Sequence, residues 1–240
     1  MQEIKDEEIK SFYDSHEDIW PEGDNWHQYT KNQLIKYVNK YMNKIRANTS
    51  FKVLNAGSGG STYDLDQEMY HLDLTDKHIS KFINHAVGSV ENIPYEENMF
   101  DVVICVGSVL NYCNASTCVR EFSKVVSTKG YLILEFESSW SMEFYKTPIH
   151  KKNVGMAITK YFDSEHKLWV YSNQYIQTLL KEHNFKIINS RRFHILSSFA
   201  YRLFKNENKA APYAKLDPLF RFIPFFSRKS HNVILLCQKN

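Results

Sequence analysis

Apolar positions along the chain follow two different spacings. Short strand-like runs, typical of strands buried on both faces of a sheet, recur before residue 138. They lie at 52–56, 68–73, 84–87, 101–106 and 131–137. Helical spacing of apolar residues predicts helices over roughly 6–18, 27–46 and 115–126, the last ended by Lys129-Gly130. This alternation predicts an α/β fold, with a mostly parallel sheet and helices on both faces.

The chain beyond residue 138 departs from strict alternation. Residues 155–171 are expected to form a hairpin that turns at Asp163-Ser164-Glu165-His166. A helix over 174–183 follows, with Ser172 as its N-cap and Asn184 as the left-handed residue after it. Further strands are expected at 185–189 and 232–238, on either side of an aromatic, basic insertion at 196–230. We expect one domain over 1–240, made of a helical cap (1–48), a core (49–138) and a C-terminal half (139–240).

Charge is unevenly distributed, although the 240 residues carry a formal net charge of only +3. The first two dozen residues are acidic and the last fifth of the chain is basic. A small net charge does not indicate nucleic acid, and we expect none as a partner. Basic residues among aromatic ones in 196–230 fit either a packed lid or a surface for a lipid-like substrate or a membrane, so peripheral membrane contact is an open alternative.

The four cysteines form no CxxC pair, and Cys105 and Cys237 lie inside apolar runs. This pattern predicts free buried thiols and neither a disulfide framework nor a metal site. The acidic, polar N-terminus does not resemble a signal peptide, and no run of eighteen apolar residues occurs. We therefore expect a cytoplasmic protein without a transmembrane segment.

Candidate chemistry begins at residues 51–60, which read FKVLNAGSGG. A buried strand ends there in a glycine-rich turn, and glycines let a backbone approach a ligand closely. Asp73 follows sixteen residues after Gly57, at the tip of the next strand, where a carboxylate can accept hydrogen bonds from ribose hydroxyls. The short spacing predicts a loop, and no full helix, over 61–68.

Three further pieces follow in order: ENIPY from Glu91, FDVVICVGSVLNY from Phe100 and KGYLILEF from Lys129. With the glycine turn and Asp73, this series resembles the class I S-adenosylmethionine-dependent methyltransferases of the small-molecule kind. The resemblance is strong over residues 50–138. It implies a Rossmann-like seven-stranded sheet, mostly parallel with an antiparallel C-terminal strand, and S-adenosylmethionine as cofactor.

The resemblance also implies roles for individual residues. Gly57 and Gly59 would lie beneath the methionine part of the cofactor, and Asp73 would hold its ribose. The remaining cofactor-binding positions flank the turn, contact adenine or line the wall near the sulfonium: Asn55, Ala56, Ser58, Leu74, Ser89, Val90, Glu91, Cys105, Val106 and Ser108. Asn55 replaces the usual acid and Ser61 a common third glycine. Ser89 replaces the usual aspartate that accepts from adenine, so Glu91 is the expected substitute.

An N-terminal helix commonly closes over the cofactor in this family. We therefore expect Tyr13, Trp20 or Tyr29 to bond the cofactor carboxylate. The weak candidates for a general base are His27, Tyr112, His166 and His194. No Asn/Asp-Pro-Pro-Tyr signature of adenine or amide methylation and no catalytic cysteine pair of RNA cytosine enzymes occurs.

These features predict methyl transfer to an O, N or C nucleophile of a small-molecule or lipid-like acceptor. Two alternatives stay open. Asn55 and Ser61 could mark a non-catalytic S-adenosylmethionine-binding protein. An NAD-dependent oxidoreductase fits less well, because Thr62 stands where its third glycine would be and pyrophosphate favours a full helix N-terminus.

Overall fold

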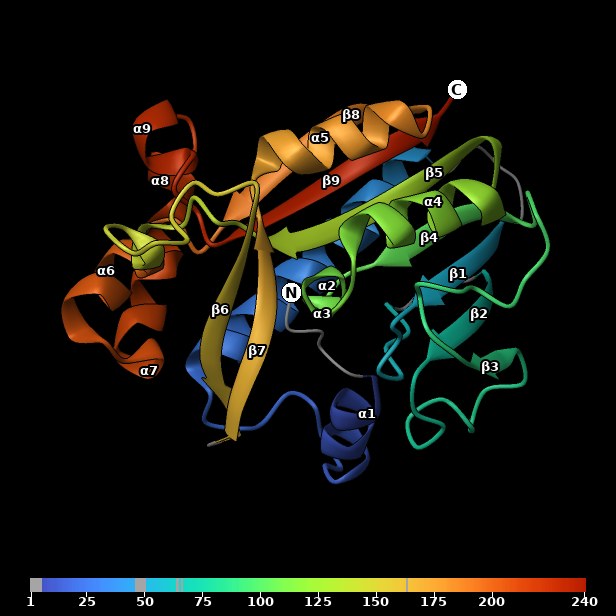
Figure 1. The fold of residues 1–240 in the computed structure, drawn as a ribbon, viewed down its shortest axis with the longest axis horizontal. Coiled ribbons are helices and arrows are strands. Elements are labelled where there is room, and N and C mark those ends of the chain that lie inside the picture. The colour runs from blue at the N-terminus through green and yellow to red at the C-terminus, as the bar shows by residue number, and fades with distance from the viewer. Residues whose placement is uncertain (1–5, 46–50, 64, 66, 163) are drawn as a thin grey trace.

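The computed structural model describes residues 6–45, 51–63, 65, 67–162 and 164–240. Seven strands form one sheet in the order β3-β2-β1-β4-β5-β9-β8 (Figure 1). Their bounds are β1 Lys52–Ala56, β2 Glu68–Asp73, β3 His85–Val87, β4 Phe100–Cys105, β5 Val126–Glu137, β8 Phe185–Phe193 and β9 Asn232–Lys239. All pairs are parallel except β5–β9 and β8–β9, so β9 is the antiparallel strand. The expected fold class is confirmed.

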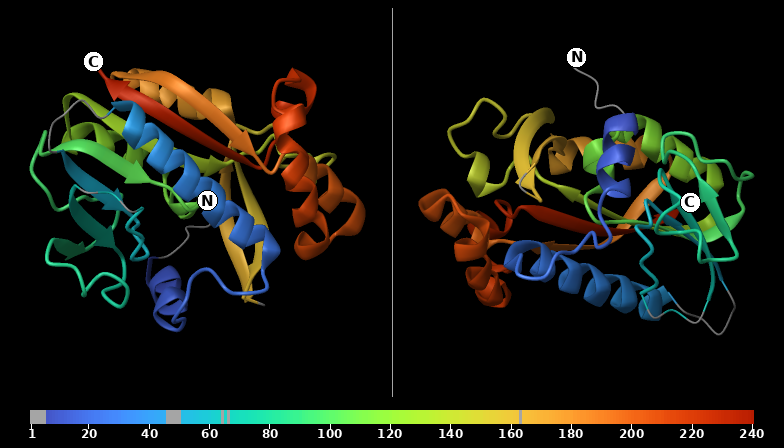
Figure 2. Two further views of the ribbon diagram at one scale, coloured as in Figure 1. Left: turned by 180° about the vertical axis from the view of Figure 1, so that it is seen from behind. Right: turned by 90° about the horizontal axis from the view of Figure 1, so that it is seen from below.

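Helices cover both faces of this sheet, as Figure 2 shows. On one face, α4 (Ala115–Val125) and α5 (Asn173–Glu182) pack over an apolar cluster that includes Phe122, Ile176 and Leu134. On the other face, α2 (Asn25–Ile45) buries Val38 and Tyr41 against the sheet. Burial on both faces explains the continuous apolar runs in the central strands.

Two predicted boundaries are wrong. Helix α4 ends at Val125, and β5 begins at the next residue rather than after Lys129-Gly130. The reason is that Phe100 pairs with Val126 but Val102 pairs with Tyr131, so Lys129-Gly130 lies in an irregularity within the strand. The hairpin strands β6 (Val154–Tyr161) and β7 (Ser164–Tyr171) turn earlier than expected, since Ser164 already pairs with Tyr161; Asp163 lies outside the described residues.

Helix α5 carries the expected caps, because the Ser172 side chain accepts from the Tyr175 N–H and Asn184 has a φ of 63°. Residues 57–67 contain no helix in their described part, as the short spacing predicted, and Asp64 and Asp66 lie outside that part. Among the helices that the structure describes, none has the length and apolar character needed to cross a bilayer.

The remaining elements surround the carboxyl ends of the parallel strands. Helix α1 (Asp6–Asp14) lies over this edge, and the β6–β7 hairpin stands beside it (Figure 1). Short helices make up most of the late insertion. These are α6 Leu196–Phe204, α7 Glu207–Ala210, η2 Ala211–Leu216, α8 Asp217–Phe220 and α9 Pro224–Ser227. Two further short helices lie outside the insertion: α3 Val109–Tyr112 after β4 and the 3-10 helix η1 Met142–Phe144 after β5. That a single domain spans 1–240 stays a prediction.

Candidate active site

A cavity of about 820 Å³ opens at the carboxyl ends of β1, β2 and β4. This is the point where the strand order reverses, and it is where open α/β sheets bind their ligands. Ten of the residues predicted for the cofactor line this cavity: Tyr13, Trp20, Gly57, Ser58, Gly59, Asp73, Leu74, Ser89, Val90 and Val106.

The glycine turn forms the floor of this first cavity, and glycine is required there by geometry. Gly57 has a φ of 71°, and a Cβ on it would lie 2.4 Å from the Val109 side chain. Gly59 has a φ of 50°, and a Cβ there would lie 2.4 Å from Ile19. The N-terminal segment therefore covers the turn directly, and any side chain on the turn would displace it.

Asp73 ties the end of β2 to the glycine turn. One carboxylate oxygen accepts the Gly59 N–H at 2.8 Å, and the other accepts the Thr75 N–H at 3.2 Å. Burial raises the pKa of Asp73, against the effect of these N–H groups. Because a carboxylate offers about four acceptor sites, two remain for ligand hydroxyl groups.

Asn55 supports the turn from below and does not line the cavity. Its side-chain amide donates to the Ser61 carbonyl at 2.8 Å and to the Ser58 hydroxyl at 3.3 Å. The Ser58 hydroxyl also lies 2.6 Å from Nδ1 of His71. A carboxylate could not donate to the Ser61 carbonyl, so an asparagine suits this turn where an acid would not.

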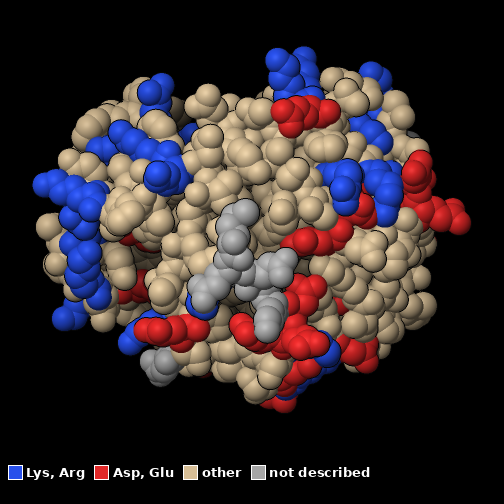
Figure 3. All heavy atoms as spheres, in the orientation of Figure 1, with Lys and Arg blue, Asp and Glu red and all other residues tan. Residues whose placement is uncertain are grey.

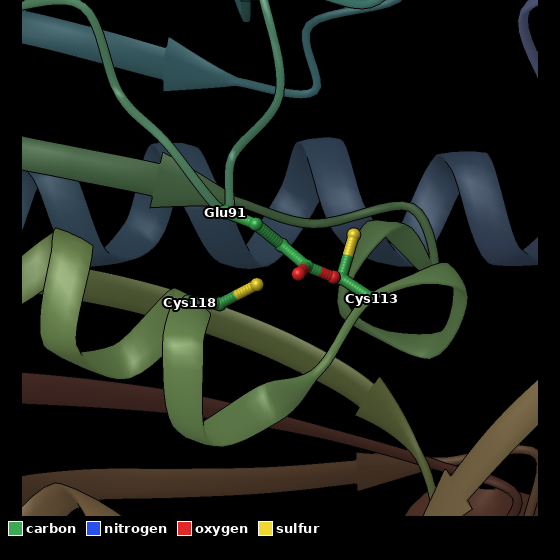
Figure 4. Close-up of side chains that lie close together, drawn as sticks. All are labelled: Glu91, Cys113 and Cys118. Carbon is green, nitrogen blue, oxygen red and sulfur yellow. The ribbon is translucent and has the colours of Figure 1, made fainter. Parts of the chain in front are cut away.

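Glu91 lies behind the cavity wall formed by Ser89 and Val90. Its ligand atom and the sulfurs of Cys113 and Cys118 lie within 4.8 Å of one another (Figure 4). The Glu91 carboxylate accepts the Asn114 N–H at 2.6 Å. A hydrogen bond with Cys113 and burial raise the pKa of Cys118 well above its usual range, which keeps that thiol protonated. Glu91 thus supports the N-terminus of α4, and Cys113 alone of the three reaches the cavity.

Several predicted cofactor residues lie away from the first cavity. Tyr29 lines neither cavity, and its hydroxyl donates to the Ala214 carbonyl in the insertion. Ala56 and Cys105 are fully buried in the core and contribute only to its packing. Ser108 turns instead toward a neighbouring cavity.

This second cavity, of about 1240 Å³, adjoins the first. The two share part of their wall: Tyr13, Ile19, Trp20, Gly107 and Tyr112. Tyr13 and Tyr112 are joined by a hydrogen bond of 3.3 Å between their hydroxyls. The two cavities are therefore direct neighbours at this shared wall.

A Glu–His–Glu cluster lies on the wall of the second cavity. Nε2 of His231 lies 3.4 Å from Glu137, and its Nδ1 lies 3.1 Å from Glu143. Glu137 also accepts the Ser108 hydroxyl at 2.7 Å. Burial lowers the pKa of His231, but the two carboxylates outweigh it and hold that pKa well above its usual range. The cluster is therefore an ion-paired imidazolium between two carboxylates.

Glu135 holds the loop between the two cavities. One of its oxygens accepts the Gly107 and Ser108 N–H groups at 3.0 and 2.8 Å, and the other accepts from Asn232 at 2.7 Å. Burial raises the pKa of Glu135 to about 7, against the effect of the Ser108 and Asn232 donors. This carboxylate fixes the backbone at 107–108 and does not line either cavity.

The structure places two of the four general-base candidates at the second cavity and the other two away from both cavities. Tyr112 and His27 line the second cavity. His194 is fully buried, lies 2.9 Å from the Thr30 hydroxyl and stacks on Trp26, so its role is packing. His166 packs against Phe12, with ring centroids 4.1 Å apart, and lines neither cavity.

A second group with metal-ligating atoms lies at the rim of the second cavity. Asp24, His27 and Glu207 place one ligand atom each within 4.8 Å of one another. Asp24 already uses one oxygen for the His27 backbone N–H and the other for the His27 ring, at 3.0 and 2.7 Å. A cation would have to replace these bonds, so the described geometry gives no reason to assign a metal.

Sequence reasoning missed the cluster of Glu137, Glu143 and His231, and also Glu135. Glu135 and Glu137 stand in the KGYLILEFE run, where acids in an apolar strand were an available signal. His231 follows the insertion, more than ninety residues after Glu137, and nothing in its neighbours marks it.

The comparisons with known proteins agree with this geometry. Residues 50–134 match the family model described as a methyltransferase domain. No curated protein sequence matches the chain significantly.

Solved structures with similar folds cover nearly the whole chain. A geranyl diphosphate C-methyltransferase from Streptomyces coelicolor A3(2), in complex with Mg²⁺, geranyl diphosphate and S-adenosyl-L-homocysteine, has a TM-score of 0.64 at 9% identity, with 98% of each chain covered. A Burkholderia thailandensis 1,6-didemethyltoxoflavin-N1-methyltransferase, with its substrate and S-adenosylhomocysteine bound, has a TM-score of 0.58 at 12% identity, covering 99% of this chain and 88% of that one.

A putative S-adenosylmethionine-dependent methyltransferase from Listeria monocytogenes has a TM-score of 0.59 at 11% identity and covers 87% and 98% of the two chains. Identities this low support the fold alone. The family match supports the methyltransferase assignment of residues 50–134. With the seven-stranded sheet and the cavity at its switch point, these comparisons show that the chain has the fold of S-adenosylmethionine-dependent methyltransferases and carries a methyltransferase domain over residues 50–134.

Proposed function

We propose that the first cavity holds S-adenosylmethionine and that the second holds a polar small-molecule acceptor. Adenine would lie against Ser89 and Val90, the ribose hydroxyls at Asp73, and the methionine part over Gly57 and Gly59. The observation that supports the proposal is the wall that the two cavities share at Tyr13 and Tyr112, because a cofactor in the first cavity would then lie next to an acceptor in the second.

Methyl transfer is an in-line displacement in which the nucleophile bonds the methyl carbon as the carbon–sulfur bond breaks. The electron pair of that bond stays on sulfur, and the cofactor becomes S-adenosylhomocysteine. The protein's main contributions are alignment of the two reactants and exclusion of water. Both apply here, because Trp20 and Ile19 cover the cavities from the N-terminal segment.

The Glu137–His231–Glu143 cluster is suited to orient the acceptor. Its two carboxylates accept hydrogen bonds from hydroxyl or amine groups, and they carry one more negative charge than the imidazolium neutralises. A hydroxyl or amine that bonds Glu137 would be held near Ser108 and the end of β4, next to the proposed methyl position. The acceptor class supported by this wall is therefore polar, with at least one hydrogen-bond donor.

The geometry weakens the two alternatives. Asn55 is explained by its bond to the Ser61 carbonyl, so it is no sign of a degraded site. A dinucleotide would lack a helix N-terminus after the glycine turn, because the described part of 57–67 holds none.

Two measurements test the proposed function. Calorimetry should show tight binding of S-adenosylhomocysteine and none of NAD. Labelled S-adenosylmethionine, offered with a panel of small amines, phenols and polyols, should transfer methyl to at least one of them. Binding without transfer to any donor-bearing acceptor would favour the non-catalytic alternative, and binding of NAD alone would overturn the assignment.

A further inference from the structure

The insertion at 196–230 exposes apolar side chains at one end of the molecule. Eight of the fourteen large apolar side chains that are exposed in the described chain lie between residues 203 and 225. Four of them crowd the short α8–α9 segment, here called the α8–α9 tip. They are Leu219, Phe222, Ile223 and Phe225, with exposed fractions of 69%, 76%, 43% and 60%. An exposed apolar group of this kind in a folded protein marks an interaction site.

The inner side of the α8–α9 tip packs against the rest of the insertion, and this packing fixes the position of the tip. The ring of Phe226 contacts those of Phe199 and Phe220, with centroids 5.4 and 5.0 Å apart. The buried Asp217 carboxylate accepts the N–H groups of Ile195 and Leu196 at 3.0 and 2.9 Å. The exposed apolar side chains of the tip are therefore attached to a well-packed segment.

Charge around the tip has one sign. The insertion carries seven basic residues, Arg202, Lys205, Lys209, Lys215, Arg221, Arg228 and Lys229. Its two acids are Asp217, which is buried, and Glu207, which lines the second cavity. Figure 3 shows Lys and Arg gathered over the end of the molecule where Figure 1 places this insertion.

Basic groups and apolar rings of the tip lie side by side. The Lys229 ammonium lies 3.9 Å from the ring centroid of Phe225, and the Arg221 guanidinium lies 4.6 Å from that of Phe222. At a lipid–water interface, aromatic rings enter the headgroup region while Lys and Arg extend to anionic groups. Neighbouring rings and cations at one tip satisfy both requirements at once.

We propose that the α8–α9 tip docks the protein on an anionic lipid surface. Charge complementarity supports this occupant, since basic groups near an anionic bilayer are attracted to its negative surface potential. A protein partner is less well supported, because four side chains are few against the 20–30 residues a side, roughly, of a stable interface. This proposal is independent of the acceptor and of catalysis.

Vesicle co-sedimentation of the full chain tests the proposal. The probes are vesicles of phosphatidylcholine alone and of phosphatidylcholine mixed with phosphatidylglycerol. We expect binding to the mixed vesicles only, with a loss at high salt. The Phe222→Ser/Phe225→Ser double variant should bind at least about tenfold more weakly, because each ring loses its apolar transfer free energy. Arg221→Gln/Lys229→Gln should weaken binding and reduce its salt dependence.

The matched control is Ile83→Ser, since Ile83 is 99% exposed but lies outside the insertion. It should bind vesicles like the parent chain. Unchanged binding of S-adenosylhomocysteine and an unchanged melting temperature show that each variant is folded. Absence of binding to the mixed vesicles, or equal binding by the Phe double variant, overturns the proposal. Light scattering that shows a dimer broken by the same variant, without vesicle binding, assigns the tip to a second copy instead.

Discussion

The two adjoining cavities are built in different ways. The floor of the first is formed by strand ends and turns between Gly57 and Cys113, the N-terminal segment covers it, and its lining holds a single carboxylate, that of Asp73. The second draws on α2, η1, the β6–β7 hairpin, α6, α7 and the start of β9, and carries Glu137, Glu143, Glu207 and two histidines.

This difference separates the binding of a common cofactor from the recognition of a specific acceptor. A cofactor shared by many enzymes can be held by backbone geometry, which needs glycines at set positions and one acid. An acceptor is distinguished by its own polar groups, which require charged partners from whichever elements reach the cavity. The first cavity should therefore respond most to backbone changes, and the second to charge changes.

The largest effect is expected from His231→Gln, which leaves Glu137 and Glu143 buried without their cation. Breaking such a buried pair destabilises a fold by about 3–5 kcal/mol. The free energy of unfolding in urea checks this. The loss should shrink at acid pH, because, against the effect of burial, His231 lowers the pKa of Glu137 in the parent, and the stability this provides is lost as the pH falls through that lowered pKa. An unchanged unfolding midpoint would show that the cluster is not ion-paired.

Gly57→Ala tests the backbone requirement of the first cavity. The added Cβ would meet Val109 at 2.4 Å and hold a φ of 71°, so we expect a loss of roughly 2–4 kcal/mol. Gly23→Ala is the matched control, since Gly23 has a φ of 88° but no atom within 4 Å of its Cβ position. The Gly23→Ala variant should lose only the stability that the positive φ costs, without a steric clash. Equal losses at the two positions would contradict the close contact with Val109.

Glu135 should make stability depend on pH. Burial raises its pKa from 4.5 to about 7, so its contribution is fully present below pH 4.5 and is lost as the pH rises through about 7. Glu135→Gln should remove this dependence and gain ~2 kcal/mol relative to the parent above pH 7, because no charge is then buried. Melting temperatures from pH 5 to pH 8 (roughly the range that matters) measure it. Glu182→Gln, on the exposed end of α5, is the control and should change nothing.

Asp73→Asn should weaken S-adenosylhomocysteine binding about tenfold, by calorimetry. The amide would turn an NH₂ group toward the Gly59 or Thr75 N–H, and it offers the ribose a neutral partner. Asp76→Asn, at an exposed carboxylate nearby, is the control. Equal affinity of the Asp73 variant and the parent would remove Asp73 from the cofactor site.

The smallest effect is expected at Tyr13 and is compared with Tyr29, because the sequence predicted both tyrosines as partners of the cofactor carboxylate. Tyr13→Phe should weaken S-adenosylhomocysteine binding by about threefold, because it removes one hydroxyl from the shared cavity wall. Tyr29→Phe should leave affinity unchanged, since its hydroxyl bonds Ala214 away from the cavity. A larger effect at Tyr29 than at Tyr13 would reverse the placement of both.

The sequence was enough to predict the structure of a segment wherever that structure depends only on residues close together in the chain. The glycine turn, the strand that ends at Asp73, the absence of a helix from the described part of 61–68 and the caps of α5 all follow from neighbouring residues. Their order along the chain was also enough for the sheet and the cofactor. The ends of α4 and β5 could not be placed, because a pairing irregularity against Phe100 decides where that strand begins.

The amino-acid sequence by itself determined the fold class and the glycine turn, since these depend on apolar periodicity and on glycine conformation, and its resemblance to a known family implied the cofactor. Only the tertiary structure decided that Tyr29 and His194 pack elsewhere, that Asn55 serves the turn, and that His231 meets Glu137 and Glu143. Each of these outcomes depends on contacts between residues far apart in the chain, and local periodicity carries no information about such contacts.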